Sequence, residues 1–176
     1  MKNFIKLCFA AVILLPSVAY ASVSEIAPLH LKLYLETLEQ LLEDIQEALK
    51  IEQYFIARDM PLAGYGMVFA VGNNCGVDPY LLPAISVVES TGGKRMQPGT
   101  NNAWGWGSGL IKFPSFQDGI LQIAERFCKS PLYAGKSTKE ILLTYNPPSA
   151  DPLYVSKVTS VMKRMEEPYT APRAAK

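Results

Sequence analysis

The stretch "DPYLLPAISVVESTGGK", residues 78–94, joins an apolar run to a single acid and then to a pair of glycines. Leu82, Ile85 and Val88 recur at helical spacing, which predicts a buried helix. The pair Gly92–Gly93 can end that helix in a left-handed turn. Glu89 therefore falls in the last turn of an apolar helix, where a carboxylate is poorly solvated.

The start of this helix is less regular than its end. Asp78 is suited to cap the helix and Pro79 to be its first residue. Pro83 lies deeper, where a proline disturbs the backbone hydrogen bonds of a helix. We therefore expect either a kink or a late start at Pro83.

The position of Glu89 favours acid–base chemistry. Desolvation disfavours the charged form of a carboxyl group, and the negative end of the helix adds a smaller effect in the same direction. A carboxylic acid that is protonated near neutral pH can donate a proton to a glycosidic leaving oxygen. The alternative is a solvated glutamate at a helix end.

A loop rich in glycine, asparagine and tryptophan follows the acid. Residues 101–109 read "NNAWGWGSG", within a stretch that predicts a loop with a short hairpin. Indole faces stack on sugar rings, and asparagine amides both donate and accept hydrogen bonds. A saccharide cleft is therefore predicted from Asn101, Asn102, Trp104 and Trp106. The alternative is that both indoles fill the core and the asparagines form a turn.

Helical spacing returns on both sides of this loop. Helices are predicted at 28–59, 67–74, 113–129, 138–146 and 151–165. The chain therefore predicts a mostly α fold.

The first of these helices carries a leucine-rich face. Its apolar residues alternate steps of four and three: Leu31, Leu35, Leu38, Leu42, Ile45 and Leu49. This spacing fits a helix packed on the following domain, a homodimer through residues 30–58, or a spacer.

The first 21 residues predict a secretory signal peptide. Lys2 and Lys6 precede an apolar run, and Ala19-Tyr20-Ala21 matches the small-x-small cleavage pattern. The alternative is a membrane anchor, but the run is shorter than the ~20 apolar residues that cross a bilayer. We expect a secreted or periplasmic protein that is associated with the cell wall and has no stable membrane insertion after cleavage.

Two cysteines remain in the mature chain. An even number of cysteines in an oxidising compartment favours a disulfide between Cys75 and Cys128. The alternative is two separate buried thiols.

Charge and histidine content exclude several kinds of protein. From residue 67 onward, twelve Lys and Arg stand against eight Asp and Glu, which suits an anionic partner such as a cell-wall polymer. Nothing resembles the basic–aromatic stripe of a nucleic-acid-binding protein. His30 is the only histidine, which argues against a Ser-His-Asp triad and a histidine zinc site. We expect no cofactor and no metal.

Four sequence blocks occur in an order that resembles a known family: "DPYLLPAISVVESTGGK", "NNAWGWGSG", "FPSFQDGI" and "LLTYNPPSADPLYVSKV". Over about residues 69–165 the chain is similar to the bacterial endo-β-N-acetylglucosaminidases (mannosyl-glycoprotein endo-β-N-acetylglucosaminidase-like) of the lysozyme-like superfamily. Glu-Ser and Tyr-Asn also resemble the lytic transglycosylases. The Gly-Leu-Met-Gln block of many transglycosylases is missing, which favours the glucosaminidases.

The resemblance implies a lysozyme-like domain whose cleft lies between a helical lobe and a small loop or hairpin lobe. It implies that Glu89 is the general acid and that Ser90, Asn102, Trp104 and Trp106 bind substrate. It also implies that Tyr145 lies across from the acid, unless Tyr145 is an ordinary packing residue. The expected organisation is a signal peptide (1–21), an amphipathic helical segment (22–66), the lysozyme-like domain (67–167) and a tail (168–176).

A second catalytic carboxylate is not evident in the sequence. Asp118 is the only acid between Ser90 and Ala124, and capping a helix is its expected role. Asp151 is expected only to open the last helix. The 2-acetamido group of the substrate can replace a second carboxylate.

We therefore expect a hydrolase that cuts β-1,4 bonds next to N-acetylglucosamine in peptidoglycan glycan strands. The alternatives are a lytic transglycosylase on the same polymer and a wall-binding module without catalysis.

Overall fold

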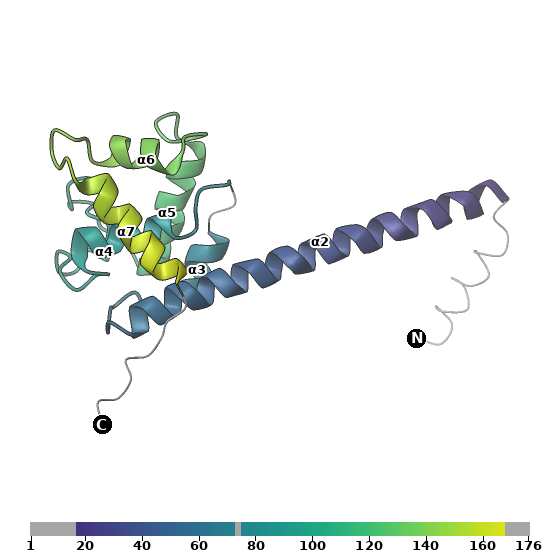
Figure 1. Cartoon of the computed structure of the whole chain (residues 1–176), viewed down its shortest axis with the longest axis horizontal. Coiled ribbons are helices and arrows are strands. Elements are labelled where there is room, and N and C mark those ends of the chain that lie inside the picture. Colours follow the sequence, from purple (N-terminus) through teal and green to yellow (C-terminus); the bar gives the residue numbers. More distant parts are fainter. Residues whose placement is uncertain (1–16, 73–74, 168–176) are drawn as a thin grey trace, which may run out of the picture. The chain divides into compact units, whose positions relative to one another are not determined.

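The computed structural model describes residues 17–72 and 75–167, and within these ranges it contains helices and loops but no strand (Figure 1). The helices are α2 (Ser17–Ile56), α3 (Gly66–Val71), α4 (Leu81–Ser90), α5 (Phe116–Lys129), α6 (Thr138–Tyr145) and α7 (Tyr154–Glu166). The predicted mostly helical fold is confirmed. The predicted short hairpin is absent from residues 95–112, which form turns.

Two predictions concern segments largely outside the described residues. The predicted signal peptide lies in residues 1–16, except for its last five residues, which belong to α2. The predicted tail, 168–176, also lies outside them. Among the described helices, none is both long enough and apolar enough to cross a membrane.

The chain forms two compact units that divide between Leu42 and Glu43, inside α2. The predicted boundary lay at residue 66 instead. The difference arises because the last turns of α2 belong to the core of the second unit, where Ile51 and Phe55 are fully buried. The helix also begins at Ser17, well before the predicted start at Pro28.

The leucine-rich face of α2 is exposed in the first unit. Leu31, Leu35 and Leu42 are about half exposed or more. The end of α2 belongs to the core of the second unit, whereas the role of these leucines stays a prediction. The homodimer stays a prediction.

The local sequence explains where α4 begins and ends. Asp78 Oδ1 accepts a hydrogen bond from the Tyr80 N–H at 2.9 Å, and the helix starts at Leu81. Pro83 is then the third helical residue, where no N–H is needed. The late start is confirmed, whereas the predicted cap at Asp78 and first residue at Pro79 are wrong, because Tyr80 is the N-cap. At the other end Thr91 takes the left-handed conformation at φ 57°, ahead of Gly92–Gly93.

Side-chain caps fix the starts of α5 and α6. The Ser115 Oγ accepts a hydrogen bond from the Asp118 N–H at 3.1 Å and donates one to Asp118 Oδ2 at 2.6 Å. Ser137 and Glu140 form a capping box at the start of α6. The N-cap of α5 is therefore Ser115, and Asp118, which was expected to cap a helix, is its hydrogen-bond partner in the first turn.

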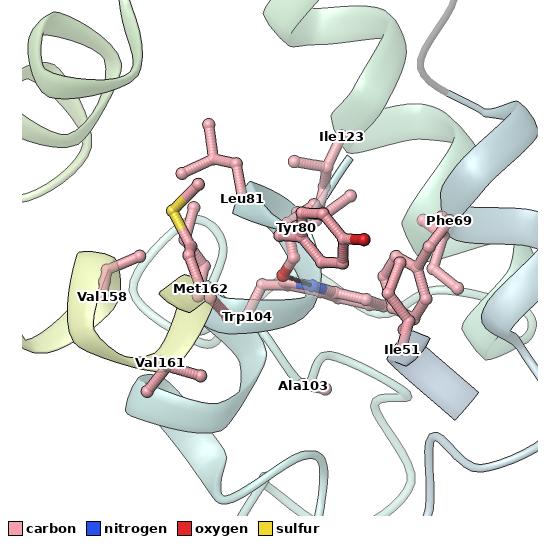
Figure 2. Packing of buried hydrophobic residues seen from close by; sticks show 14 of the residues in the cluster. Ile51, Phe69, Tyr80, Leu81, Ala103, Trp104, Ile123, Val158, Val161 and Met162 are labelled. Atoms are coloured by element: carbon pink, nitrogen blue, oxygen red, sulfur yellow. Dashed lines mark hydrogen bonds between the residues drawn. The ribbon is translucent and has the colours of Figure 1, made fainter. Parts of the chain in front are cut away.

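The core of the second unit is built around Trp104, whose side chain is fully buried (Figure 2). Its ring lies edge-on to Phe69 and Phe113, with centroids 6.4 and 6.2 Å away. Its Nε1–H donates to the Leu82 carbonyl at 3.1 Å, which satisfies the one polar atom of the side chain. Gly119 of α5 lies so close that a Cβ there would be 2.6 Å from the indole.

Cys75 and Cys128 lie at disulfide distance, with Cα atoms 5.6 Å apart. Such a separation is typical of a disulfide. The pair connects the end of α5 to the segment before α4. The structure therefore supports the predicted pairing over two separate thiols.

Candidate active site

Glu89 is the penultimate residue of α4 and lies on a groove of about 620 Å³ between α4 and α7. The two helices lie side by side (Figure 1). The residues before the acid, Ala84 and Ile85, are completely buried, whereas Glu89 is exposed to the groove. A groove of this size is in the range of small-ligand sites.

Each oxygen of the Glu89 carboxylate has a close neighbour. Tyr154, the first residue of α7, donates its hydroxyl to Oε1 at 2.7 Å. Oε2 faces Gly105, where an added Cβ would lie only 2.9 Å away. A helix and a glycine loop thus fix the direction of the acid, and only a glycine leaves room for it.

Burial raises the pKa of Glu89 above its ordinary value. The hydrogen bond from Tyr154 opposes this rise, and the negative charge of Asp151 adds to it. One side of Glu89 is open to the groove, but the protein atoms around the carboxyl group still remove enough water to favour the protonated form. Burial also raises the pKa of Tyr154, so its hydroxyl stays protonated and able to donate.

Tyr145 contacts the site through Tyr154. The two rings are stacked, with centroids 6.1 Å apart and an angle of 9° between their planes. The Tyr145 hydroxyl donates to the Trp104 carbonyl. The Tyr145 hydroxyl is therefore hydrogen-bonded to the backbone of the loop. The Tyr145 ring packs on Tyr154, and Tyr154 contacts the acid.

A second hollow of about 310 Å³ lies beside the acid. Its walls are Gly105, Trp106, Gly107, Ser108, Tyr133 and Tyr145. The Trp106 ring lies 5.5 Å from that of Tyr145 and 6.1 Å from that of Tyr133, so three aromatic rings meet here. Gly105, one wall of this hollow, lies against Glu89, which lines the groove, so the hollow and the groove are neighbours.

Four of the predicted substrate-binding residues are buried or hydrogen-bonded within the protein instead of lining a cleft. Trp104 is fully buried, so its ring has no face free for a sugar. Asn102 is buried. Its side-chain amide donates to the Trp106 and Ile111 carbonyls and accepts from the Trp106 N–H. Asn101 donates to the carbonyls of two loop residues, Phe113 and Pro114.

Ser90 also has a structural role. It is 3 % exposed. Its Oγ donates to the Ala103 carbonyl at 2.6 Å and accepts from the Gly93 N–H at 2.9 Å. These four residues therefore shape the loop, which corrects the expectation that they line a cleft. Of the loop residues predicted to bind a sugar, Trp106 alone lines a hollow.

The structure adds residues that the sequence did not single out. Tyr154, Asn146, Asp151 and Lys157 line the groove with Glu89. Asp151 does more than open the last helix, because it lies in the same groove as the acid. Its Oδ2 accepts from Lys157 Nζ at 2.6 Å, and this hydrogen bond lowers the pKa of Asp151. The signal was the block "DPLYVSKV", in which Tyr154 and Lys157 fall on one helix face.

The described residues contain no group of three or more His, Cys, Asp or Glu side chains that could hold a metal ion. No protein-family model matches the sequence. No curated protein sequence matches it either. The lysozyme-like resemblance thus stays a prediction drawn from four short blocks.

Proposed function

We propose that the protein is a glycoside hydrolase that cleaves β-1,4 bonds next to N-acetylglucosamine in peptidoglycan, with Glu89 as its general acid. The observation that carries the proposal is the Glu89 carboxyl group. It faces a groove, its pKa is raised, and a tyrosine hydroxyl fixes one of its oxygens. A proton donor for a glycosidic oxygen needs access to the substrate and a raised pKa, and the tyrosine hydroxyl fixes its direction.

In the proposed reaction Glu89 protonates the leaving oxygen while the 2-acetamido oxygen of the substrate attacks the anomeric carbon. Water then opens the cyclic intermediate, and the Glu89 carboxylate takes its proton. The Tyr154 hydroxyl stabilises the carboxylate that forms after the first proton transfer. Asp151 is poorly suited to be a second nucleophile, because Lys157 and the Leu153 N–H already occupy its oxygens.

The hollow around Trp106 is the proposed site of a sugar ring. Its glycine-rich wall lets the ligand approach the backbone, and its aromatic rings offer apolar faces. The excess of basic residues after position 67 suits the anionic polymer. We propose a secreted or periplasmic location because of the predicted signal peptide and the Cys75–Cys128 pair.

Digestion of purified peptidoglycan tests the proposal. Glu89→Gln keeps the shape of the side chain but removes its proton, so release of soluble fragments should be lost. Asp118→Asn is the matched control, because Asp118 lies in the first turn of α5 and outside the groove. Asp151→Asn should keep most of the activity. Equal losses in the Glu89 and Asp151 variants would replace the single-acid mechanism with a two-carboxylate one.

A lytic transglycosylase would also use a single acid. The masses of the products distinguish it from the proposed hydrolase. Reducing N-acetylglucosamine ends support the hydrolase. Anhydro-muramyl ends would assign the site to a transglycosylase. If the protein binds insoluble peptidoglycan but releases no soluble fragments, it is a wall-binding module without catalysis.

A further inference from the structure

The groove continues beyond Glu89 along one face of α7. Lys157, Ser160 and Arg164 line it at spacings of three and four residues, so they point to the same side of the helix. A helix rises 1.5 Å per residue, so the distance along the axis from Tyr154 to Arg164 is about 15 Å. The groove therefore extends beyond the position of the bond that the proposed reaction cleaves.

Arg164 is the uncompensated cation of this groove. Lys157 is neutralised by Asp151, with 2.6 Å between Nζ and Oδ2. Arg164 forms no ion pair with any residue in the part of the chain that the structure describes. Its Nη1 donates to Ser160 Oγ at 2.7 Å, which orients the guanidinium group. An oriented guanidinium is well suited to bind a carboxylate through two parallel hydrogen bonds.

Asn146 lines the same groove, and its amide oxygen has no hydrogen-bond partner in the protein. Its Oδ1 is buried and has no hydrogen bond, and among the described residues no other buried side-chain nitrogen or oxygen is in this state. A buried polar atom without a partner costs about 1–3 kcal/mol. Asn146 lines the groove, so a rotation of its side chain would bring this oxygen to an N–H group of a ligand.

A peptide carries both amide N–H donors and a free carboxylate. We propose that the groove along α7 binds the carboxylate-bearing peptide that is attached to the glycan strand, with Arg164 as the carboxylate receptor and Asn146 as an amide receptor. The inference rests on the proposed function, because it places the peptide on a sugar next to the cleaved bond. It makes peptide-substituted strands, and not chitin-like or denuded strands, the preferred substrate.

Binding to two polymers tests this proposal without turnover. The Glu89→Gln protein is bound to soluble glycan strands that carry peptides and to the same strands after amidase removal of the peptides. Peptide-bearing strands should bind more tightly. Adding Arg164→Gln should weaken that binding about five- to tenfold, the range for a charge-assisted hydrogen bond at an exposed site. It should leave the binding of denuded strands unchanged.

Lys163→Gln is the matched control, since Lys163 lies in the same turn of α7 but does not line the groove. It should leave both affinities unchanged. Equal binding of the two polymers, or equal losses in the Arg164 and Lys163 variants, would overturn the proposal. An equal loss on both polymers in the Arg164 variant would overturn it as well.

Wild-type turnover on the same two polymers separates this inference from the proposed function. If wild-type protein releases no fragments but its peptide preference depends on Arg164, the hydrolase assignment fails and the peptide site stands. If wild-type protein cuts both polymers equally well and Arg164→Gln has no effect, the hydrolase stands and the peptide site fails.

Discussion

The contact between Gly105 and Glu89 predicts that Gly105→Ala slows turnover about tenfold without unfolding the protein. Gly105 has φ +62°, and alanine in this left-handed conformation costs about 1–2 kcal/mol. The new Cβ would lie 2.9 Å from Glu89 Oε2, whereas ordinary contacts begin at 3.4 Å. The carboxylate must therefore move by about 0.5 Å, away from the position that Tyr154 fixes.

The expected loss of activity follows from this displacement. Misplacing a reacting group by about 1 Å can cost a factor of about 100, so a shift of half that size should slow turnover about tenfold. The assay is the initial rate of soluble fragment release from purified peptidoglycan, with the melting temperature measured in parallel.

Gly109→Ala is the matched control for this experiment. Gly109 lies in the same loop and has φ +77°, but a Cβ there meets no atom within 4 Å. Both variants should lose the same 1–2 kcal/mol of unfolding free energy, and only Gly105→Ala should lose turnover. If Gly105→Ala keeps the turnover of Gly109→Ala, the position of the Glu89 carboxylate does not control the reaction.

Three further changes have defined outcomes. Tyr154→Phe removes the hydrogen bond that lowers the pKa of Glu89, so the pH above which activity falls should move upward; a downward shift in the pH–rate profile would contradict this. Reducing the Cys75–Cys128 disulfide, which closes a separation of 53 residues, should lower the unfolding free energy by about 4 kcal/mol in urea titrations; an unchanged midpoint would refute it. Leu38→Glu should abolish any dimer in light scattering, whereas a wild-type monomer would end the homodimer prediction.

Local sequence was sufficient for the position of the acid. An apolar run that ends in glycines places Glu89 in the last turn of a helix, and the structure has it there. The helix caps at Ser115 and Ser137 are equally local, because each involves a residue three positions away, although the predicted start at residue 113 missed Ser115. Patterns of this length depend on backbone geometry alone.

Partners distant in sequence were not predictable in the same way. Tyr154 lies 65 residues from Glu89, and only the packing of α7 on α4 brings them together. Trp104 and Trp106 are separated by one glycine, yet one is in the core and the other lines a hollow. Composition cannot distinguish the two indoles, because the distinction arises from the left-handed turn at Gly105.

The boundary inside α2 was missed for a related reason. The heptad-like spacing continues past Leu42, so the sequence shows one uninterrupted helix. The change occurs on another face, where Ile51 and Phe55 enter the core. A pattern along one face of a helix does not report what covers the opposite face.

The hydrogen bonds of Ser90 determine which parts of the site can yield when a polymer enters. Because Ser90 donates to Ala103 and accepts from Gly93, it ties the end of α4 and the acid on it to the glycine loop. The connection between Asn146 and Asp151, which both line the groove, is instead exposed to solvent at residues 147–150. Entry of a glycan strand should therefore displace residues 147–150 more than the carboxyl group of Glu89.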